Sequence, residues 1–335
     1  MITLGIETSC DETAVAVVED GFTVLSNLIA SQVQLHERFG GVVPEVAARA
    51  HVEALNPLME EALAAADVGF GDLDHVAVTV GPGLVGALLT GMAAAKAVSL
   101  ATGAALVGVN HLEGHVWANF LAHGPPEPPY VALVVSGGHT MLVHIPTLFH
   151  HEVLGQTLDD AAGEAFDKVA RMIGLGFPGG PALDRMAQGG DPHAIAFPRA
   201  MVDSGDYDFS LSGLKTAVLR YVKRERAAGH DLNLPDLAAS FQEAIVDVQV
   251  TKTIAAAKEM AVPTVLLGGG VVANTRLRER LQAAGEAEGL RVLYPPLDLC
   301  TDNGAMIACV GAARAAIGER TSLDIGADPQ LRLAT

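Results

Sequence analysis

Two histidines one helical turn apart form a pattern in this chain that could bind a metal ion. They lie in Asn110-His111-Leu112-Glu113-Gly114-His115, where Asn110 is a good helix N-cap. His111 and His115 then share one helix face, which is ligand spacing for a transition metal. Asp302, directly before the last predicted helix, is available as a third ligand. The alternative is two satisfied histidines and an aspartate that only caps its helix.

The position of Glu113 argues against a metalloprotease. In the zinc protease motif HExxH the glutamate directly follows the first histidine and acts as the base. Here the glutamate comes one position later, on a different face of the helix.

Two predicted hairpin turns carry residues that suit phosphate chemistry. The first spans Gly5 to Thr13, where small hydroxyl residues could present backbone N–H groups to a phosphate, and Asp11 and Glu12 could act as a base or steer a metal. The alternative is a polar turn with two solvated acids.

The second turn lies at the matching place in the second half of the chain. Two apolar residues typical of a buried strand, Val134 and Val135, precede Ser136, Gly137, Gly138 and His139. Glycines let the backbone approach an anion closely, so this turn predicts a phosphate cradle, with His139 as a further catalytic candidate or a simple turn residue.

Two further segments are candidates for binding a nucleoside. Leu266 to Asn274 runs from a buried strand through three glycines into a helix, which allows a ribose or a flat ring to pack on bare backbone. Asp159 to Lys168 places acidic side chains near one helix face, where they bind substrate hydroxyls or form an exposed acidic face.

These motifs fall on two halves with the same order of elements. Period-two alternation and β-branched residues predict the strands, and Ala-rich runs with caps predict the helices. The first half reads as strands 2–7, 13–18 and 23–30, helix 44–66, strand 75–80, helix 84–100, strand 104–109 and helix 111–121. The second reads as strands 130–135, 140–145 and 152–155, helices 161–173 and 237–260, strand 264–267, helix 271–284, strand 291–294 and helix 303–316.

This repeated order predicts an α/β fold of the duplicated actin/sugar-kinase-like type (ASKHA, ribonuclease H-like), with two lobes and a central cleft. We expect lobes at 1–124 and 130–335, joined by the proline-rich 125–129, with an irregular insertion at about 174–215. His111 and His115 would then come from one lobe and Asp302 from the other, so a shared ion would join the lobes.

Composition narrows the functional classes. Half of the 335 residues are hydrophobic and only 4% are aromatic, which suits a core of Ala, Val, Leu and Ile. The uncharged stretch 76–95 is interrupted by glycines and Pro82, which favours a strand, a turn and a core helix over a membrane span. Three cysteines without a CxxC pair favour the cytoplasm, and nothing at the N-terminus resembles a secretory signal.

The net charge of −18 opposes binding of a nucleic acid by the chain alone. One modest basic cluster, Arg220, Lys223, Arg224 and Arg226, is the exception, although a solvated helix face is the favoured interpretation of it.

Together these motifs resemble the bacterial tRNA N(6)-adenosine threonylcarbamoyltransferase family, within the glycoprotease-like group. The motifs that carry the resemblance extend from about residue 2 to 313: GIETSCDET, GGVVPEVAAR, GPGLVGAL, HLEGH, VSGGHT, DDAAGEAFDK, FPGGP, SLSGLKT, GGGVVAN and CTDNGAMIA. Archaeal and eukaryotic relatives carry a tyrosine near the metal where this chain has Val134, so the bacterial form is the closer match.

The resemblance implies transfer of a threonylcarbamoyl group from threonylcarbamoyl-adenylate to the adenosine just 3′ of the anticodon, in tRNAs reading ANN codons, with release of AMP. It implies one divalent metal held by His111, His115 and Asp302, with iron favoured and zinc as the alternative. The substrate-binding positions that it implies are Val134, Val135, Ser136, Gly137, Gly138, Asp167, Gly180, Asp184 and Asn274. It also implies a non-catalytic paralogous subunit and a small ATPase as partners.

Other classes remain to be weighed against this transferase. An ATP-dependent small-molecule kinase or a carbamoyltransferase of the same fold is the main alternative, and a kinase has no need of the histidine pair. A non-catalytic scaffold subunit is disfavoured because both glycine loops and all three candidate metal ligands are retained.

Overall fold

The computed structural model describes residues 1–333, which form two compact units. Unit 1 comprises residues 1–126 and 295–333, and unit 2 comprises residues 127–294. The expected division at 124–130 is therefore close, but the expected second lobe is too long. Residues 295–333 belong with the N-terminal half.

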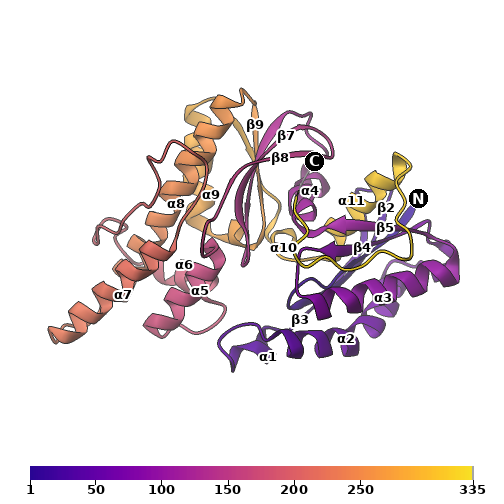
Figure 1. Cartoon of the computed structure of the whole chain (residues 1–335), viewed down its shortest axis with the longest axis horizontal. Helices are drawn as coiled ribbons and strands as arrows, with labels where there is room; N and C mark the ends of the chain where they lie inside the picture. The colour runs from indigo at the N-terminus through magenta and orange to yellow at the C-terminus, as the bar shows by residue number, and fades with distance from the viewer. Residues whose placement is uncertain (334–335) are drawn as a thin grey trace. The chain divides into compact units, whose positions relative to one another are not determined.

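Unit 1 is built on a five-stranded sheet in the order β3-β2-β1-β4-β5 (Figure 1). Its strands are β1 (Ile2–Glu7), β2 (Glu12–Glu19), β3 (Thr23–Ser31), β4 (His75–Gly81) and β5 (Ala105–Asn110). The first three form an antiparallel meander, and β4 and β5 continue it in parallel with β1.

Helices cover both faces of this sheet. They are α1 (Val33–Glu37), α2 (Pro44–Ala65), α3 (Val85–Thr102), α4 (His111–His123), α10 (Leu297–Cys300) and α11 (Gly304–Ala316), with a 3₁₀ turn at Phe70–Asp72. Side-chain alternation on β2 separates the faces: Val15 and Val17 pack in the cluster that contains α2 residues, while Ala16 and Val18 pack against Ala305 and Ala308 of α11.

Bare backbone lets α11 lie close against β1 and β2. A Cβ at Gly5 of β1 would collide with the Gly304 carbonyl and Ala308, and a Cβ at Gly304 would collide with Val15 and Ala16. This close approach explains why the last helix belongs to unit 1, and periodicity alone could not reveal it.

One helix in residues 1–333, α3, is long and apolar enough to cross a membrane. One face of α3 buries Ala87, Leu88, Met92, Ala95 and Val98, and the helix packs on β4 and α2. The strand, turn and helix expected here are therefore present.

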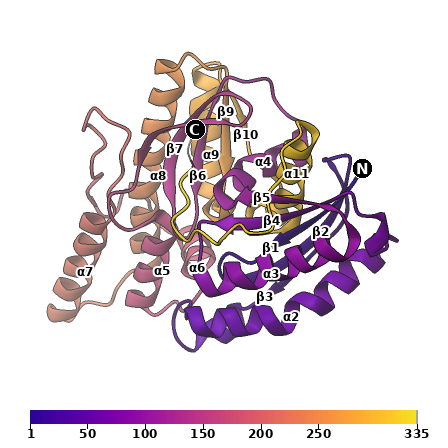
Figure 2. The same cartoon turned by 45° about the vertical axis from the view of Figure 1, so that its right-hand side comes forward.

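Unit 2 repeats the topology of unit 1 with its own five-stranded sheet, in the order β10-β9-β6-β7-β8 (Figure 2). The strands are β6 (Tyr130–Val135), β7 (Thr140–Thr147), β8 (His150–Gln156), β9 (Thr264–Gly268) and β10 (Arg291–Leu293). The antiparallel meander β6-β7-β8 corresponds to β1-β2-β3 of unit 1. The parallel strands β9 and β10 correspond to β4 and β5. The duplicated α/β plan is confirmed.

The helices of unit 2 differ in part from expectation. They are α5 (Ala162–Ile173), α6 (Gly179–Ala187), α7 (Ser212–Ala227), α8 (Leu234–Glu259) and α9 (Thr275–Ala287), with a 3₁₀ turn at Gly270–Ala273. The segment 174–215 is not wholly irregular, because it contains α6 and the start of α7. The helix expected at 271–284 is divided at Asn274, whose side chain caps α9 by accepting a hydrogen bond from Leu277 N at 2.9 Å.

Candidate functional site

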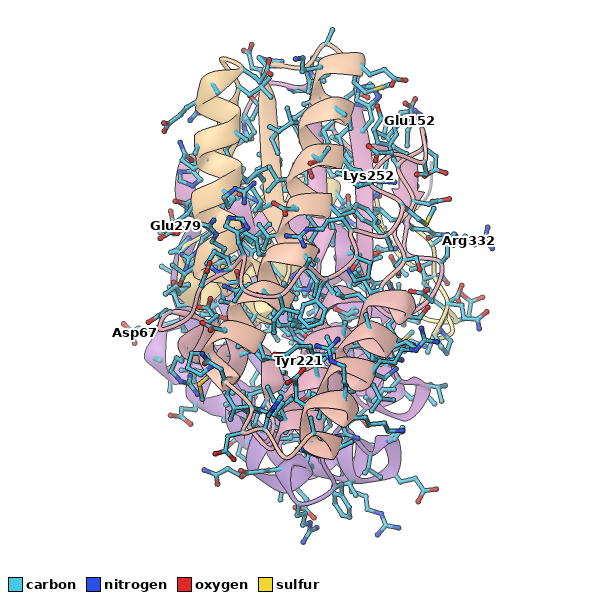
Figure 3. All side chains as sticks on the ribbon, turned by 90° about the vertical axis from the view of Figure 1, so that its left-hand side faces the viewer. Asp67, Glu152, Tyr221, Lys252, Glu279 and Arg332 are labelled. Carbon is cyan, nitrogen blue, oxygen red and sulfur yellow. The ribbon has the colours of Figure 1, made fainter. Side chains whose placement is uncertain are left out.

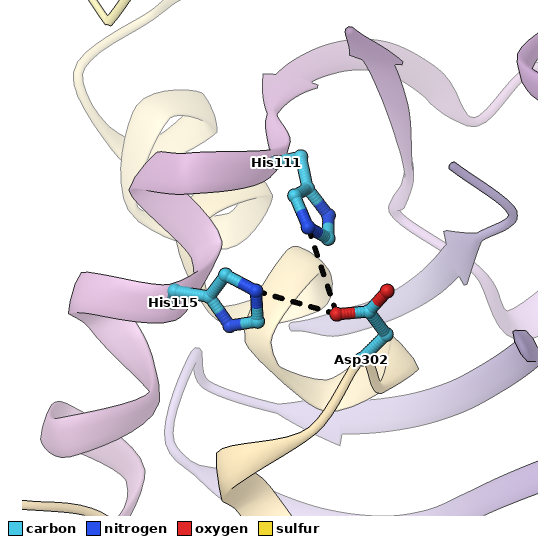
Figure 4. A group of neighbouring side chains, drawn as sticks. All are labelled: His111, His115 and Asp302. Atoms are coloured by element: carbon cyan, nitrogen blue, oxygen red, sulfur yellow. Dashed lines mark ion pairs between the residues drawn. The ribbon is translucent and has the colours of Figure 1, made fainter. Parts of the chain in front are cut away.

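Three of the predicted residues meet in unit 1 at the start of α4. The Nε2 atoms of His111 and His115 lie 3.6 and 3.3 Å from Asp302 Oδ1, and the possible ligand atoms all lie within 4.8 Å of one another (Figure 4). Both imidazoles are buried, while Asp302 remains partly exposed. The arrangement can hold one cation and leaves open positions for further ligands.

The location of Asp302 corrects one expectation. Asp302 lies between α10 and α11, which belong to unit 1 together with α4. All three candidate ligands therefore come from one unit, so an ion held here does not join two lobes. Asp302 is also not the N-cap of α11, because Asn303 accepts the capping hydrogen bond from Met306 N.

The buried Glu7 orients His111. Its Oε2 lies 3.0 Å from His111 Nδ1 and accepts a hydrogen bond from Thr79 Oγ1 at 2.6 Å, while Ser9 N donates to Oε1. A carboxylate on Nδ1 directs the Nε2 lone pair of the neutral ring toward Asp302. Burial disfavours the charged ring, yet Asp302 and Glu7 raise the pKa of His111 to about 9.

His115 supplies the test of whether a metal fits. Its side chain is fully buried, and neither ring nitrogen has a hydrogen-bond partner among residues 1–333. Buried polar atoms without hydrogen-bond partners are rare. His115 Nε2 points at the Asp302 carboxylate, beside the imidazole of His111. A divalent ion would satisfy His115 Nε2, so the donor set fits a transition metal such as iron or zinc.

Asp11 and Glu12 belong to the turn between β1 and β2 in the same unit. Burial, followed by the charges of Asp11 and Asp302, raises the pKa of Glu12 to about 9, so Glu12 is protonated at neutral pH. The buried His51 of α2 supports the turn, with Nε2 3.0 Å from the Cys10 carbonyl oxygen and Nδ1 2.8 Å from Thr13 Oγ1.

The turn after β6 belongs to unit 2, as does His139. Ser136 N donates to the His139 carbonyl at 2.8 Å, and Ser136 Oγ accepts from His139 N at 3.2 Å, which closes the turn on itself. Gly137 and Gly138 are exposed, with no atom within 4 Å of an added Cβ. Packing therefore does not require these glycines, and their backbone is open to a ligand.

Unit 2 contains a cavity of about 260 Å³ beside this turn. Five of the nine predicted substrate residues line it: Gly137, Asp167, Gly180, Asp184 and Asn274. Four do not line it. Val134 and Val135 have fully buried side chains in β6, and Ser136 and Gly138 lie on the adjoining turn.

The acidic side chains of the cavity differ in their partners. Asp167 Oδ1 accepts a hydrogen bond from Gly179 N at 2.6 Å, which ties α5 to the start of α6. Asp184 Oδ2 accepts from Thr275 Oγ1 at 3.1 Å, but its buried Oδ1 has no hydrogen-bond partner among residues 1–333. A ligand hydroxyl or amine would satisfy that oxygen.

The DDAAGEAFDK segment is divided between two roles. Asp160 pairs with Lys168 at 2.7 Å and with Lys215 at 2.5 Å, so it is a structural residue rather than a ribose ligand. Glu164 pairs with Lys168 on the helix surface. The residues of this segment that line the cavity are Gly163, Phe166 and Asp167.

Sequence reasoning missed several residues that complete these sites. Glu7 has a signal in the sequence, because it is a charged residue at the end of a mostly apolar strand. Gly163 lets α5 approach the Ser136 turn, because a Cβ there would meet the Ser136 carbonyl oxygen at 2.7 Å. Arg185 also lines the cavity and lies outside every motif identified in the sequence. The remaining lining residues lie within those motifs but are not among the predicted substrate-binding positions: Phe166, Pro178, Pro181, Gly270, Val271 and Ala273.

Known proteins are similar to this chain over nearly all of its sequence. A protein from Symbiobacterium thermophilum is 56% identical over 98% of this chain and 96% of its own. One from Clostridioides difficile is 49% identical over 99% of this chain and 98% of its own. Both are named tRNA N6-adenosine threonylcarbamoyltransferase.

Comparison of structures supports the fold. The chain is similar to the ROK hexokinase from Thermus thermophilus, with a TM-score of 0.51 and 17% identity over 95% of this chain and 100% of the other. A sugar kinase with this coverage confirms the sugar-kinase-like fold. The model of the tRNA N6-adenosine threonylcarbamoyltransferase family matches residues 23–309. By this match and by its full-length relatives, the chain belongs to the tRNA N6-adenosine threonylcarbamoyltransferase family.

Proposed function

We propose that this chain transfers a threonylcarbamoyl group from threonylcarbamoyl-adenylate to the N6 amine of a tRNA adenosine, the one 3′ of the anticodon in tRNAs reading ANN codons. The amine attacks the carbamoyl carbon, a C–N bond forms, and the bond to the phosphate oxygen breaks so that AMP leaves. Family membership supplies the reaction class. The observation that carries the assignment of the donor site is the cavity of unit 2.

The cavity suits the adenylate part of this donor. Its wall combines the open backbone of Gly137 and Gly180 with the apolar surfaces of Phe166 and Val271, on which a flat ring can pack. Asp184 offers an unpaired buried oxygen for a ribose hydroxyl. Open glycine backbone suits a phosphate. A small-molecule kinase of the same fold is less favoured, because it gives no role to the paired imidazoles of unit 1.

We propose that His111, His115 and Asp302 hold one divalent ion, iron in preference to zinc. Such an ion supplies Lewis acidity toward a phosphate or carbonyl oxygen. The orphaned nitrogens of His115 support this proposal. Glu7 holds the His111 ring in the orientation that binding of the ion requires.

The proton of the attacking amine requires a base. Glu12 is protonated at neutral pH and cannot accept it as it stands. We therefore assign the base to Asp11, with Glu12 as a hydrogen-bond donor. His139 remains a second candidate, from unit 2.

The partners and the location are part of the same proposal. We propose that the chain works in the cytoplasm with a non-catalytic paralogous subunit and a small ATPase. The free thiols of Cys10, Cys300 and Cys309 suit a reducing compartment. The exposed apolar side chains Val85, Leu89 and Leu100 on α3 support a protein interface there rather than a membrane span.

The test is reconstitution. Purified chain, threonylcarbamoyl-adenylate and unmodified tRNA, with and without the partner subunits, are incubated, and the nucleosides are analysed by mass spectrometry. We expect the modified adenosine and AMP in equal amounts. ATP consumption with phosphorylation of a small molecule, and no modified nucleoside, would support the kinase instead.

Variants at the metal centre complete the test. His115→Ala and Asp302→Ala each remove one of three ligands and should lower both the metal content and the transfer rate. Stoichiometric metal in both variants would place the ion elsewhere.

A further inference from the structure

Helix α7 presents a basic face that the proposed chemistry does not use. Leu214, Val218 and Val222 are buried at a spacing of four residues, and α7 packs through them on α5 and α8. Arg220 and Lys223 lie on the opposite side of the helix, with Arg226 nearby, and all three are exposed. α7 lies at the outer edge of unit 2 (Figure 1).

These three cations have no internal partner. Within residues 1–333, Arg220, Lys223 and Arg226 make no ion pair, side-chain hydrogen bond or ring contact. Several other cations of unit 2 do pair with carboxylates, as Lys168 does with Asp160 and Arg276 with Glu243. In a chain of net charge −18, unpaired cations gathered on one helix are a local exception that favours an anionic partner.

An aromatic ring adjoins the basic face. The Arg224 guanidinium lies 5.1 Å from the centre of the Tyr221 ring, which also contacts Phe197 edge-on. Tyr221 is labelled in Figure 3. Tyr221 is partly exposed. Arginine beside an aromatic ring is a combination that RNA-binding surfaces use, because bases stack on both.

The basic helix is fixed to the element that lines the cavity. Asp159 accepts hydrogen bonds from the hydroxyls of Ser210 and Ser212 at 2.6 Å each, and from Leu211 N at 2.7 Å. Asp160 pairs with Lys215. Asp159 and Asp160 directly precede α5, so the start of α7 is held against the helix that carries Phe166 and Asp167 into the cavity.

From this arrangement we infer that Arg220, Lys223 and Arg226 bind phosphates of the tRNA substrate. The inference rests on the proposed function for its choice of RNA. A protein with an acidic face would meet the same charges, but the aromatic ring and the link to the cavity favour the nucleic acid. The surface supplies local attraction that the net charge of the chain opposes.

The test uses the full-length chain with Arg220, Lys223 and Arg226 all changed to Gln, which keeps a good helix former and the buried stripe. The matched control changes Arg38, Arg291 and Arg332 to Gln. These are also exposed, and their loss gives the same net charge. Binding of unmodified tRNA is measured directly by fluorescence anisotropy from low to physiological salt, separately from transfer.

We expect the α7 variant to bind tRNA about tenfold more weakly or worse, and to lower the slope of log affinity against log salt by about 3. The KM for tRNA in the assembled enzyme should rise, while the KM for the donor stays unchanged. The control should match wild type within about twofold.

Unchanged tRNA affinity and salt slope in the α7 variant would overturn the inference. So would a loss of partner-subunit binding with unchanged tRNA affinity, because it would assign the face to a protein. Failure of transfer by the wild-type enzyme would instead contradict the proposed function, since tRNA binding is measured without it.

Discussion

The Glu113 carboxylate accepts three hydrogen bonds from the Arg314 guanidinium, at 2.9, 2.9 and 3.2 Å. Glu113 stands between the two histidines on α4, and Arg314 stands on α11, which begins two residues after Asp302. The pair therefore ties together the two elements that carry the candidate metal ligands. This contact, rather than base catalysis, accounts for the glutamate within the histidine motif.

Loss of Arg314 should be costly. Burial raises the pKa of Glu113 to about 7 although Arg314 opposes it, so Arg314→Met leaves a buried carboxyl without its partner. We expect a loss of about 3–5 kcal/mol in the free energy of unfolding, measured in urea, together with reduced metal content. Glu319→Gln is the control, because it removes only the exposed partner of Arg314 and should change stability by about 0.5 kcal/mol or less. Equal effects of the two changes would disprove this role.

Glu7→Gln should weaken metal binding without removing a ligand. The amide nitrogen of Gln would face His111 Nδ1, or its oxygen would be a weaker acceptor, so the ring loses the partner that directs Nε2. We expect an affinity about tenfold to hundredfold lower, measured by competition with a chromophoric chelator. Thr79→Val, which removes a different hydrogen bond to Glu7, should have a smaller effect. Wild-type affinity in Glu7→Gln would show that His111 needs no orienting carboxylate.

Metal affinity should depend on pH in a defined direction. Asp302 and Glu7 raise the pKa of His111 to about 9 in the metal-free protein, so a metal must displace a proton from this ring below that pH. Affinity should therefore rise as pH increases, by up to about tenfold per unit for one released proton, and level off near pH 9. Calorimetry in buffers of different ionisation enthalpy counts the protons. No proton release at pH 7 would contradict the protonated state of His111.

Gly137→Val should block the donor while the fold survives. The added side chain meets no atom of the protein within 4 Å at its Cβ, but it enters the backbone surface that lines the cavity. We expect donor binding to be lost in calorimetry, with the free energy of unfolding changed by about 0.5 kcal/mol. Gly326→Val, at an equally open position in unit 1, is the control. Normal donor affinity in Gly137→Val would exclude the Ser136–Gly138 turn as the phosphate cradle.

Local sequence patterns predicted the strands and the pairing of the two imidazoles. Each of these features depends only on residues that are close together in the sequence. The four-residue spacing of His111 and His115 brings their rings together on any helix. The partners of these residues depend on long-range packing instead. Glu7 is 104 residues from His111, and Arg314 is 201 residues from Glu113, so no periodicity could pair them.

The same limit explains the error about Asp302. Its position in the chain suggested the second lobe, whereas unit membership depends on which sheet α11 covers. That choice rests on the close approach of Gly304 to β1 and β2. In unit 2, the Gly-rich and acidic segments pointed toward the cavity, but the apolar wall residues such as Phe166 look like ordinary core residues in sequence.

The return of residues 295–333 to unit 1 has a consequence for synthesis of the chain. A ribosome makes the protein from its N-terminus, and domains usually fold in that order. Here residues 1–126 emerge without α11, so the part of the sheet that α11 covers stays open and Asp302 is missing. Unit 2 is continuous and can complete its fold during translation. The N-terminal unit, begun first, therefore finishes after unit 2, and its three candidate metal ligands can come together only once Asp302 has been made.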